Sequence, residues 1–283
     1  MSAEKPDHNA DADEAGPAPE TGAAGGTPPA NSLMDQVRLA LAFLTRIPSG
    51  VNHDGGTGAL ARAAWAFPLI GVLIGGLGGG VVMLTSGSGL HPLACALLAL
   101  AVMAAVTGAL HEDGLADFAD GLGGQTRERR LDIMADPRIG AFGVLALIFS
   151  VGLRSTALMS LSGPGIACAT MIAAAGLSRA GMVLAMHWLS PARQGGLGHG
   201  AGRPSQTVTI AAVALGLAAA VPLLWINGVG VIGILGAAFA AALFTGWAMH
   251  AALGGQTGDG LGAQQQATET AIYLAAAGAG VIL

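Results

Sequence analysis

Three aspartates with helical spacing are the residues of this sequence most able to carry chemistry. Asp113, Asp117 and Asp120 stand at positions i, i+4 and i+7 of the segment HEDGLADFADGLGGQTRERRLDIMADPR, residues 111–138. On a helix these positions share one face, and like charges there are unfavourable unless a cation neutralises them. Oxygen ligands without clustered His or Cys suit Mg²⁺, which completes its shell with water and phosphate oxygens. The spacing therefore predicts a Mg²⁺ site on these three catalytic carboxylates.

Glycines and arginines follow the aspartates directly. Glycine lets a ligand approach the backbone closely, and the guanidinium group matches the geometry of phosphate oxygens. We predict that five charged residues of this stretch bind substrate: Arg127, Arg129, Arg130, Asp136 and Arg138. With the metal, they describe a site for a diphosphate. The alternative is a solvated loop, acidic at one end and basic at the other.

A second polar segment, GGQTGDG at residues 254–260, interrupts the apolar C-terminal part of the chain. Asp259 is its one charged residue, and we expect it to add a metal ligand. Gln256 and Thr257 are predicted to contact substrate. The alternative is a glycine-rich turn in which Asp259 caps the last helix.

Four further side chains could take part in the chemistry. His111 is a candidate general base, and Arg193 is a candidate phosphate ligand or an anchor at the membrane surface. Arg154 and Arg179 fall inside predicted membrane spans, roughly 22 and 14 Å from the cytoplasmic ends of those spans at 1.5 Å per residue. Charges at such depth normally face the interior of the bundle and have a partner. They fit a transporter, or a cavity open to the cytoplasm in which Arg179 binds an anionic substrate.

The composition indicates that these residues belong to a membrane protein, whose helices must position them. The 283 residues are 53% hydrophobic and only 10% charged, whereas soluble domains carry about 25% charged residues. This excludes an ordinary soluble domain and a nucleic-acid binder. Residues 1–32 hold six acidic residues against one Lys, which accounts for the whole net charge of -5. We predict a disordered acidic tail over 1–32, because it lacks apolar periodicity, and one membrane-embedded domain over 33–283.

The predicted fold is an all-α polytopic membrane helix bundle. Segment 33–48 is too short to cross a membrane and is expected to be an interfacial helix. Seven apolar stretches have the length of a membrane span, at 65–86, 92–110, 139–161, 165–188, 207–226, 229–252 and 267–283. Glycine-rich runs within them suit close helix packing in lipid.

The positions of the arginines predict the orientation of the bundle. Seven arginines lie in the connections 47–64, 111–138, 189–206 and 253–266, and the alternate connections have neither Arg nor Lys. Under the positive-inside rule, the four charged connections face the cytoplasm. An enzyme would concentrate its polar residues at this one side, whereas a secondary transporter of an anionic solute would need them near the middle of the membrane.

The 110–140 segment, LHEDGLADFADGLGG followed by RERR, IM and DPRIG, resembles the cobalamin synthase (adenosylcobinamide-GDP ribazoletransferase) family. FLTRIP at 43–48, FPLIG at 67–71, Ser178-Arg179 and GGQTGD at 254–259 extend the resemblance over 33–275. Glu112 departs from it, because many members have an apolar residue there.

The resemblance implies a Mg²⁺-dependent transferase in the bacterial inner membrane with its active site facing the cytoplasm. It implies transfer of α-ribazole, or its 5′-phosphate, onto adenosylcobinamide-GDP with release of GMP, in the final steps of cobalamin biosynthesis. Its partners would be these two substrates and the lipid membrane, with no nucleic acid. A homo-oligomer, or association with other cobalamin-assembly enzymes, is a further expectation. Charge neutralisation by metal and arginines suits such a phosphoryl transfer.

Overall fold

The structure is a computed structural model that describes residues 1, 32–50, 58–193, 200–227 and 230–280. It is about 80% helical, and the described residues contain no strand. The helices are α1 (Leu33–Leu44), α2 (Ala59–Ala63), the short 3-10 helix η1 (Ala64–Ala66), α3 (Phe67–Thr85), α4 (Pro92–Thr107), α5 (Leu110–Gly121), α6 (Arg127–Met134), α7 (Ala141–Met159), α8 (Pro164–Trp188), α10 (Gln206–Ala219), α11 (Val221–Asn227), α12 (Gly230–Leu253) and α13 (Gly258–Gly280). The predicted all-α class is confirmed. The predicted acidic tail lies almost entirely outside the described residues.

Five helical stretches of the described chain are long and apolar enough to cross a membrane. They are Ala59–Thr85, Ala141–Met159, Pro164–Trp188, Gln206–Leu224 and Gly230–Leu253. Each coincides with a predicted span, and we treat these five as the membrane-spanning helices of a multi-pass membrane protein. The short helix predicted at the N-terminus is present as α1. Ser32 caps its start, because the Ser32 hydroxyl accepts a hydrogen bond from the backbone N–H of Asp35.

The predicted number of seven spans is not confirmed, for two local reasons. Helix α4 has only 16 residues and reaches span length only together with α5, from which it is bent by 91°. Gly108 and Ala109 make this bend with left-handed φ angles of 65° and 55°. Helix α13 begins at Gly258 rather than near 267, and its first half is polar.

Helix α8 lies at the centre of the bundle and is mostly buried. Its neighbour α3 approaches it through glycines at every fourth position. A Cβ atom on Gly71 would collide with the Ala175 carbonyl, and one on Gly75 would collide with the Met171 carbonyl. The predicted use of small residues for close helix packing is therefore confirmed at the α3–α8 contact.

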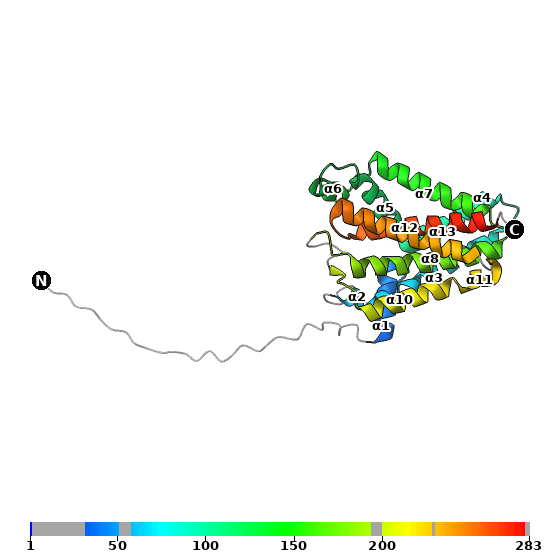
Figure 1. The fold of residues 1–283 in the computed structure, drawn as a ribbon, viewed down its shortest axis with the longest axis horizontal. Coiled ribbons are helices and arrows are strands. Elements are labelled where there is room, and N and C mark those ends of the chain that lie inside the picture. Colours follow the sequence, from blue (N-terminus) through cyan, green and yellow to red (C-terminus); the bar gives the residue numbers. More distant parts are fainter. Residues whose placement is uncertain (2–31, 51–57, 194–199, 228–229, 281–283) are drawn as a thin grey trace.

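The four charged connections meet at one end of the bundle, which we call the polar end (Figure 1, left). The Ala61 N–H donates to the Ala201 carbonyl at 2.9 Å, and the Ala192 N–H donates to the Gln256 carbonyl at 2.8 Å. Arg127 Nε donates to the Leu253 carbonyl at 2.7 Å. These contacts link all four connections, so the structure confirms that they share a side.

Candidate active site

Helices α5 and α13 bring the two polar segments of the sequence into contact. They touch at a pair of glycines, where no side chain separates the backbones. A Cβ on Gly114 would lie 2.8 Å from the carbonyl oxygen of Asp259, and a Cβ on Gly262 would lie 3.2 Å from the carbonyl oxygen of His111. This crossing places Asp113 of α5 and Asp259 of α13 on the wall of one cavity.

The carboxylates at this crossing lie at the polar end, outside the membrane-spanning helices, and they repel one another. Burial, with the negative charges of Asp113, Asp259 and Asp120, raises the pKa of Asp117 to about 6. Burial also raises the pKa of Asp259, although the positive charge of Arg193 acts in the opposite direction. Such a cluster of carboxylates would be stabilised by a cation.

The donor set of this cluster fits a magnesium ion that shares its shell with substrate. In the described part of the chain, no three His, Cys, Asp or Glu side chains are placed to hold one metal ion. Mg²⁺ commonly takes one or two protein carboxylates and fills its other positions with water and phosphate oxygens. Asp113, Asp117 and Asp259 offer such oxygens, so the residues present suit this mode of binding.

Asp120, the third aspartate of the stripe, has a different partner. Its carboxylate accepts hydrogen bonds from the backbone N–H groups of Gly140 at 2.7 Å and Gly143 at 2.9 Å. Both are at the start of α7, whose first N–H groups lack partners within the helix. Asp120 thus caps α7 from another helix. Its predicted role as a metal ligand stays a prediction.

The arginines that follow the aspartates divide into two groups. Arg127 and Arg130 bind the C-terminal carbonyls of α12: Arg127 Nε donates to Leu253, and Arg130 Nη1 donates to Ala252 at 3.0 Å. The second guanidinium nitrogen Nη2 of Arg127 also donates to the Ala192 carbonyl. These two arginines therefore join α6 to α12 and to the connection after α8.

The second group is exposed to solvent. Arg138 forms a two-point ion pair with Asp136, with N–O distances of 3.0 and 2.7 Å. The hydrogen bonds from Arg138 lower the pKa of Asp136 to about 2. Arg129 is exposed nearby, and its charge also lowers that pKa. Of the predicted diphosphate ligands, Arg129 is thus the one least engaged in structural bonds.

Backbone hydrogen bonds hold the connection before α13 in place. Gln256 exchanges hydrogen bonds with Ser190 and Ala192 across an isolated bridge to Pro191. The Thr257 hydroxyl accepts a hydrogen bond from the Gly260 N–H at 3.0 Å and caps α13. The alternative in which Asp259 caps this helix is therefore wrong, because Thr257 has that role.

The two deep arginines share one partner, Glu269 of α13. Arg154 Nη1 lies 3.3 Å and Arg179 Nη1 lies 3.1 Å from its two carboxylate oxygens. Arg154 Nη2 also lies 3.7 Å from Glu112 Oε1, which in turn accepts a hydrogen bond from Gln266 at 3.0 Å. The expectation that each deep arginine has a partner is confirmed. Arg179 forms an ion pair with Glu269 and does not line the cavity beside Asp113.

This buried group, which we call the Glu269 network (Arg154, Arg179, Glu269, Glu112 and Gln266), was missed as a unit by the sequence reasoning. A usable signal was present, because Glu269 falls within the predicted 267–283 span and its charge can neutralise an arginine at similar depth. The network also accounts for Glu112, which faces Arg154 from the position next to Asp113.

The cavity beside the aspartates, which we call the α5–α13 cavity, has a volume of about 120 Å³. Its polar lining is formed by His111, Asp113 and Asp259. Its other lining residues are Phe43, Leu60, Phe67, Leu110, Met182, Met186, Ala201, Gly258, Leu261 and Gly262. His111 is buried, and burial together with the charges of Arg179 and Arg154 lowers its pKa. The imidazole is therefore neutral at pH 7 and able to accept a proton.

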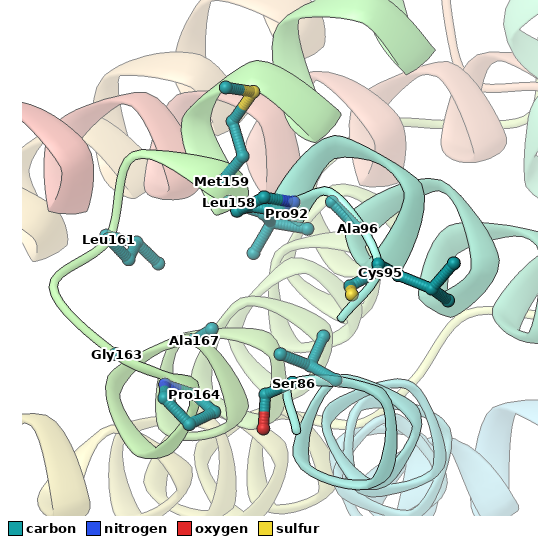
Figure 2. Close-up of a pocket in the computed structure, with 12 residues that line it drawn as sticks. Ser86, Pro92, Cys95, Ala96, Leu158, Met159, Leu161, Gly163, Pro164 and Ala167 are labelled. Atoms are coloured by element: carbon teal, nitrogen blue, oxygen red, sulfur yellow. The ribbon is translucent and has the colours of Figure 1, made fainter. Parts of the chain in front are cut away.

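Two other cavities have an apolar lining. One of about 170 Å³ lies at the opposite end of the bundle, where Ser86, Pro92 and Pro164 surround it (Figure 2). The other, of about 320 Å³, lies between α8 and α12 and is lined by Trp188 and Trp247. No Asp, Glu, Lys or Arg side chain lines either of them, so neither combines carboxylates and guanidinium groups for phosphate chemistry.

Comparison with known proteins finds relatives along most of this chain. The family described as Cobalamin-5-phosphate synthase matches residues 36–277. A protein of Bradyrhizobium diazoefficiens named Adenosylcobinamide-GDP ribazoletransferase is 43% identical over 253 residues, which cover 89% of this chain and 96% of that protein. Proteins with the same name from Brucella anthropi and Mesorhizobium japonicum are 42% and 43% identical, over 86% of this chain in each case and 96% and 93% of those proteins. No solved structure gives a significant match.

Proposed function

This chain belongs to the cobalamin-5-phosphate synthase family, and from that premise we propose that its polar end transfers α-ribazole, or its 5′-phosphate, onto adenosylcobinamide-GDP. The relatives bear the name of this ribazoletransferase activity. The observation that carries the proposal for this site is the α5–α13 crossing. It places two carboxylates and a neutral imidazole around one cavity at the end where the arginines gather.

The chain's own groups account for the parts of such a reaction. A ribazole hydroxyl attacks the phosphorus that stays with cobinamide; a new P–O bond forms, and the P–O bond to GMP breaks. His111 can accept the hydroxyl proton, because burial keeps it neutral. Arg129 and Arg193 are positioned at the polar end to attract the diphosphate.

Magnesium dependence is part of this proposal. One or two of the carboxylates of Asp113, Asp117 and Asp259 would hold the ion, with phosphate and water oxygens completing its shell. When bound, Mg²⁺ would neutralise negative charge on the diphosphate and on the departing GMP. The raised pKa of Asp117 supports this assignment, because, after burial, its causes are the negative charges of Asp113, Asp259 and Asp120.

A reconstitution assay tests the proposed function. Purified protein in detergent or lipid is supplied with adenosylcobinamide-GDP, α-ribazole and Mg²⁺, and the formation of adenosylcobalamin and GMP is followed. We expect both products in equal amounts, and their loss when Asp113 is replaced by Asn. Wild-type protein that forms neither product, although correctly folded, would refute the proposal.

We also propose that the polar end faces the cytoplasm of a bacterial inner membrane. The one-sided arginines support this orientation. Glu128 of α6 has a side chain that is 75% exposed at the polar end, and exposed Ser88 lies at the other end. After replacement of Cys95 and Cys168, an impermeant thiol reagent should label Ser88→Cys and leave Glu128→Cys unlabelled when added outside spheroplasts. The reverse pattern would refute the orientation.

A secondary transporter has less support from this structure. Arg154 and Arg179, the residues that favoured it, are bound to Glu269. Neither lines any of the three cavities described above.

A further inference from the structure

The α5–α13 cavity has a lining that is unusual for a site that handles phosphate. Three polar residues, His111, Asp113 and Asp259, line it, and the remaining surface is aliphatic, aromatic and thioether. Phe43 stacks on the fully buried Phe67, with ring centroids 5.7 Å apart and planes inclined by 17°. Met182 and Met186 of α8 face the same space. Aromatic rings and methionine sulfur both make favourable contacts with a flat aromatic ligand.

We infer that this cavity binds the aromatic base of the nucleoside acceptor and determines which base the enzyme accepts. The inference rests on the proposed function, from which the acceptor, α-ribazole, is known to be a nucleoside with a methylated benzimidazole base. That base is planar and largely apolar. Its sugar hydroxyl would then lie at the polar edge of the cavity, beside His111, Asp113 and Asp259.

The size and polarity of the cavity argue against the other parts of the substrates. A cavity of about 150 Å³ holds one benzene ring. At about 120 Å³ this cavity is smaller than that, so a benzimidazole fits only if the flexible side chains of Met182 and Met186 move aside. The corrin macrocycle is far larger. Guanine carries several hydrogen-bonding groups, and burying them against Phe43, Met182 and Leu261 would leave them without partners at a considerable cost. A benzimidazole has fewer such groups.

A buried nitrogen of His111 provides an independent sign of a ligand. The residue is 1% exposed, and its Nε2 has no hydrogen-bond partner among the described residues. Buried polar atoms are normally paired. A hydroxyl of the bound nucleoside can pair with this nitrogen, which would orient the attacking oxygen toward the carboxylates of Asp113 and Asp259.

Steady-state kinetics of a cavity variant and a matched core variant test the inference. Met186→Ala removes a side chain from the cavity wall. Met171→Ala removes the same side chain from the same helix at a buried position outside the lining. In Met186→Ala we expect the KM for α-ribazole to rise by about 10- to 200-fold, the range for small changes in an apolar pocket. The KM for adenosylcobinamide-GDP should stay within about twofold, and Met171→Ala should change neither KM selectively.

Three results separate the inference from the proposed function. A wild-type enzyme that makes no adenosylcobalamin would refute the function, and the inference with it. A wild-type enzyme that turns over, with an unchanged KM for α-ribazole in Met186→Ala, would refute the inference alone. Equal rises in both KM values, or the same rise in Met171→Ala, would also refute it. If Met186→Ala does not fold, the half-buried Phe43→Leu takes its place under the same criteria.

Discussion

Replacing Glu269 by Gln should severely destabilise the protein, because it would leave two deeply buried arginines without a counterion. The side chains of Arg154 and Arg179 are 3% and 1% exposed, and Glu269 is within 3.3 Å of both. Removing one partner of a buried ion pair costs about 3–5 kcal/mol. Arg154 would keep Glu112, at 3.7 Å, whereas Arg179 would keep only neutral partners such as the Ala175 carbonyl.

Thermal unfolding in detergent, followed by far-UV circular dichroism, measures this effect. At about 2–4 °C per kcal/mol for a chain of this size class, the expected loss corresponds to a fall in Tm of about 6–20 °C. Glu128→Gln is the matched control, since it also removes one carboxylate near an arginine, here at 3.8 Å on an exposed surface. Exposed pairs contribute about 0–1 kcal/mol, so the control should unfold close to the wild type.

A charge-balanced double variant checks the cause. Glu269→Gln combined with Arg179→Met removes the uncompensated charge together with its partner, and it should recover much of the lost Tm. If Glu269→Gln unfolds at the temperature of Glu128→Gln, or if the double variant is less stable than the single one, the reasoning from buried charge is wrong.

Three further predictions concern the α5–α13 crossing and the aspartates. Gly114→Ala should separate α5 from α13 and lower kcat or the apparent Mg²⁺ affinity in the transfer assay, whereas Gly152→Ala, with open space at its Cβ, should behave as the wild type. Asp120→Ala should lower the free energy of unfolding by about 0.5–2 kcal/mol, the range for a lost helix cap, with the apparent Mg²⁺ affinity unchanged in titrations; a large loss of Mg²⁺ affinity would instead support a metal ligand. The pKa of Asp117 is raised to about 6. Ionisation of this carboxylate therefore destabilises the metal-free protein as the pH rises from about 4 to 6. Below pH 6, protons compete with the metal for the carboxylate. The Mg²⁺ concentration for half-maximal activity should therefore fall between pH 5.5 and 7.5, and Asp117→Asn should abolish this dependence.

The sequence by itself determined the class of the protein and the end of it that carries the chemistry. Hydropathy is a local property summed over a helix, so five of the seven predicted spans agree closely with long apolar helices. The arginine distribution placed four connections on one side, and backbone contacts such as Ala61 with Ala201 confirm it. The spacing of Asp113 and Asp117 depends only on helix geometry, and α5 has that geometry.

Only the tertiary structure decided which side chains are available at that end. Asp120 has the same helical phase as its neighbours, yet it caps α7, because the start of that helix reaches it. Likewise, Arg127 donates a hydrogen bond to the Leu253 carbonyl, because the end of α12 reaches it. Asp259 joins Asp113 through a glycine contact between helices more than a hundred residues apart in the chain. Such partners depend on how helices cross in space, and the spacing of residues along one helix carries no information about where another helix ends.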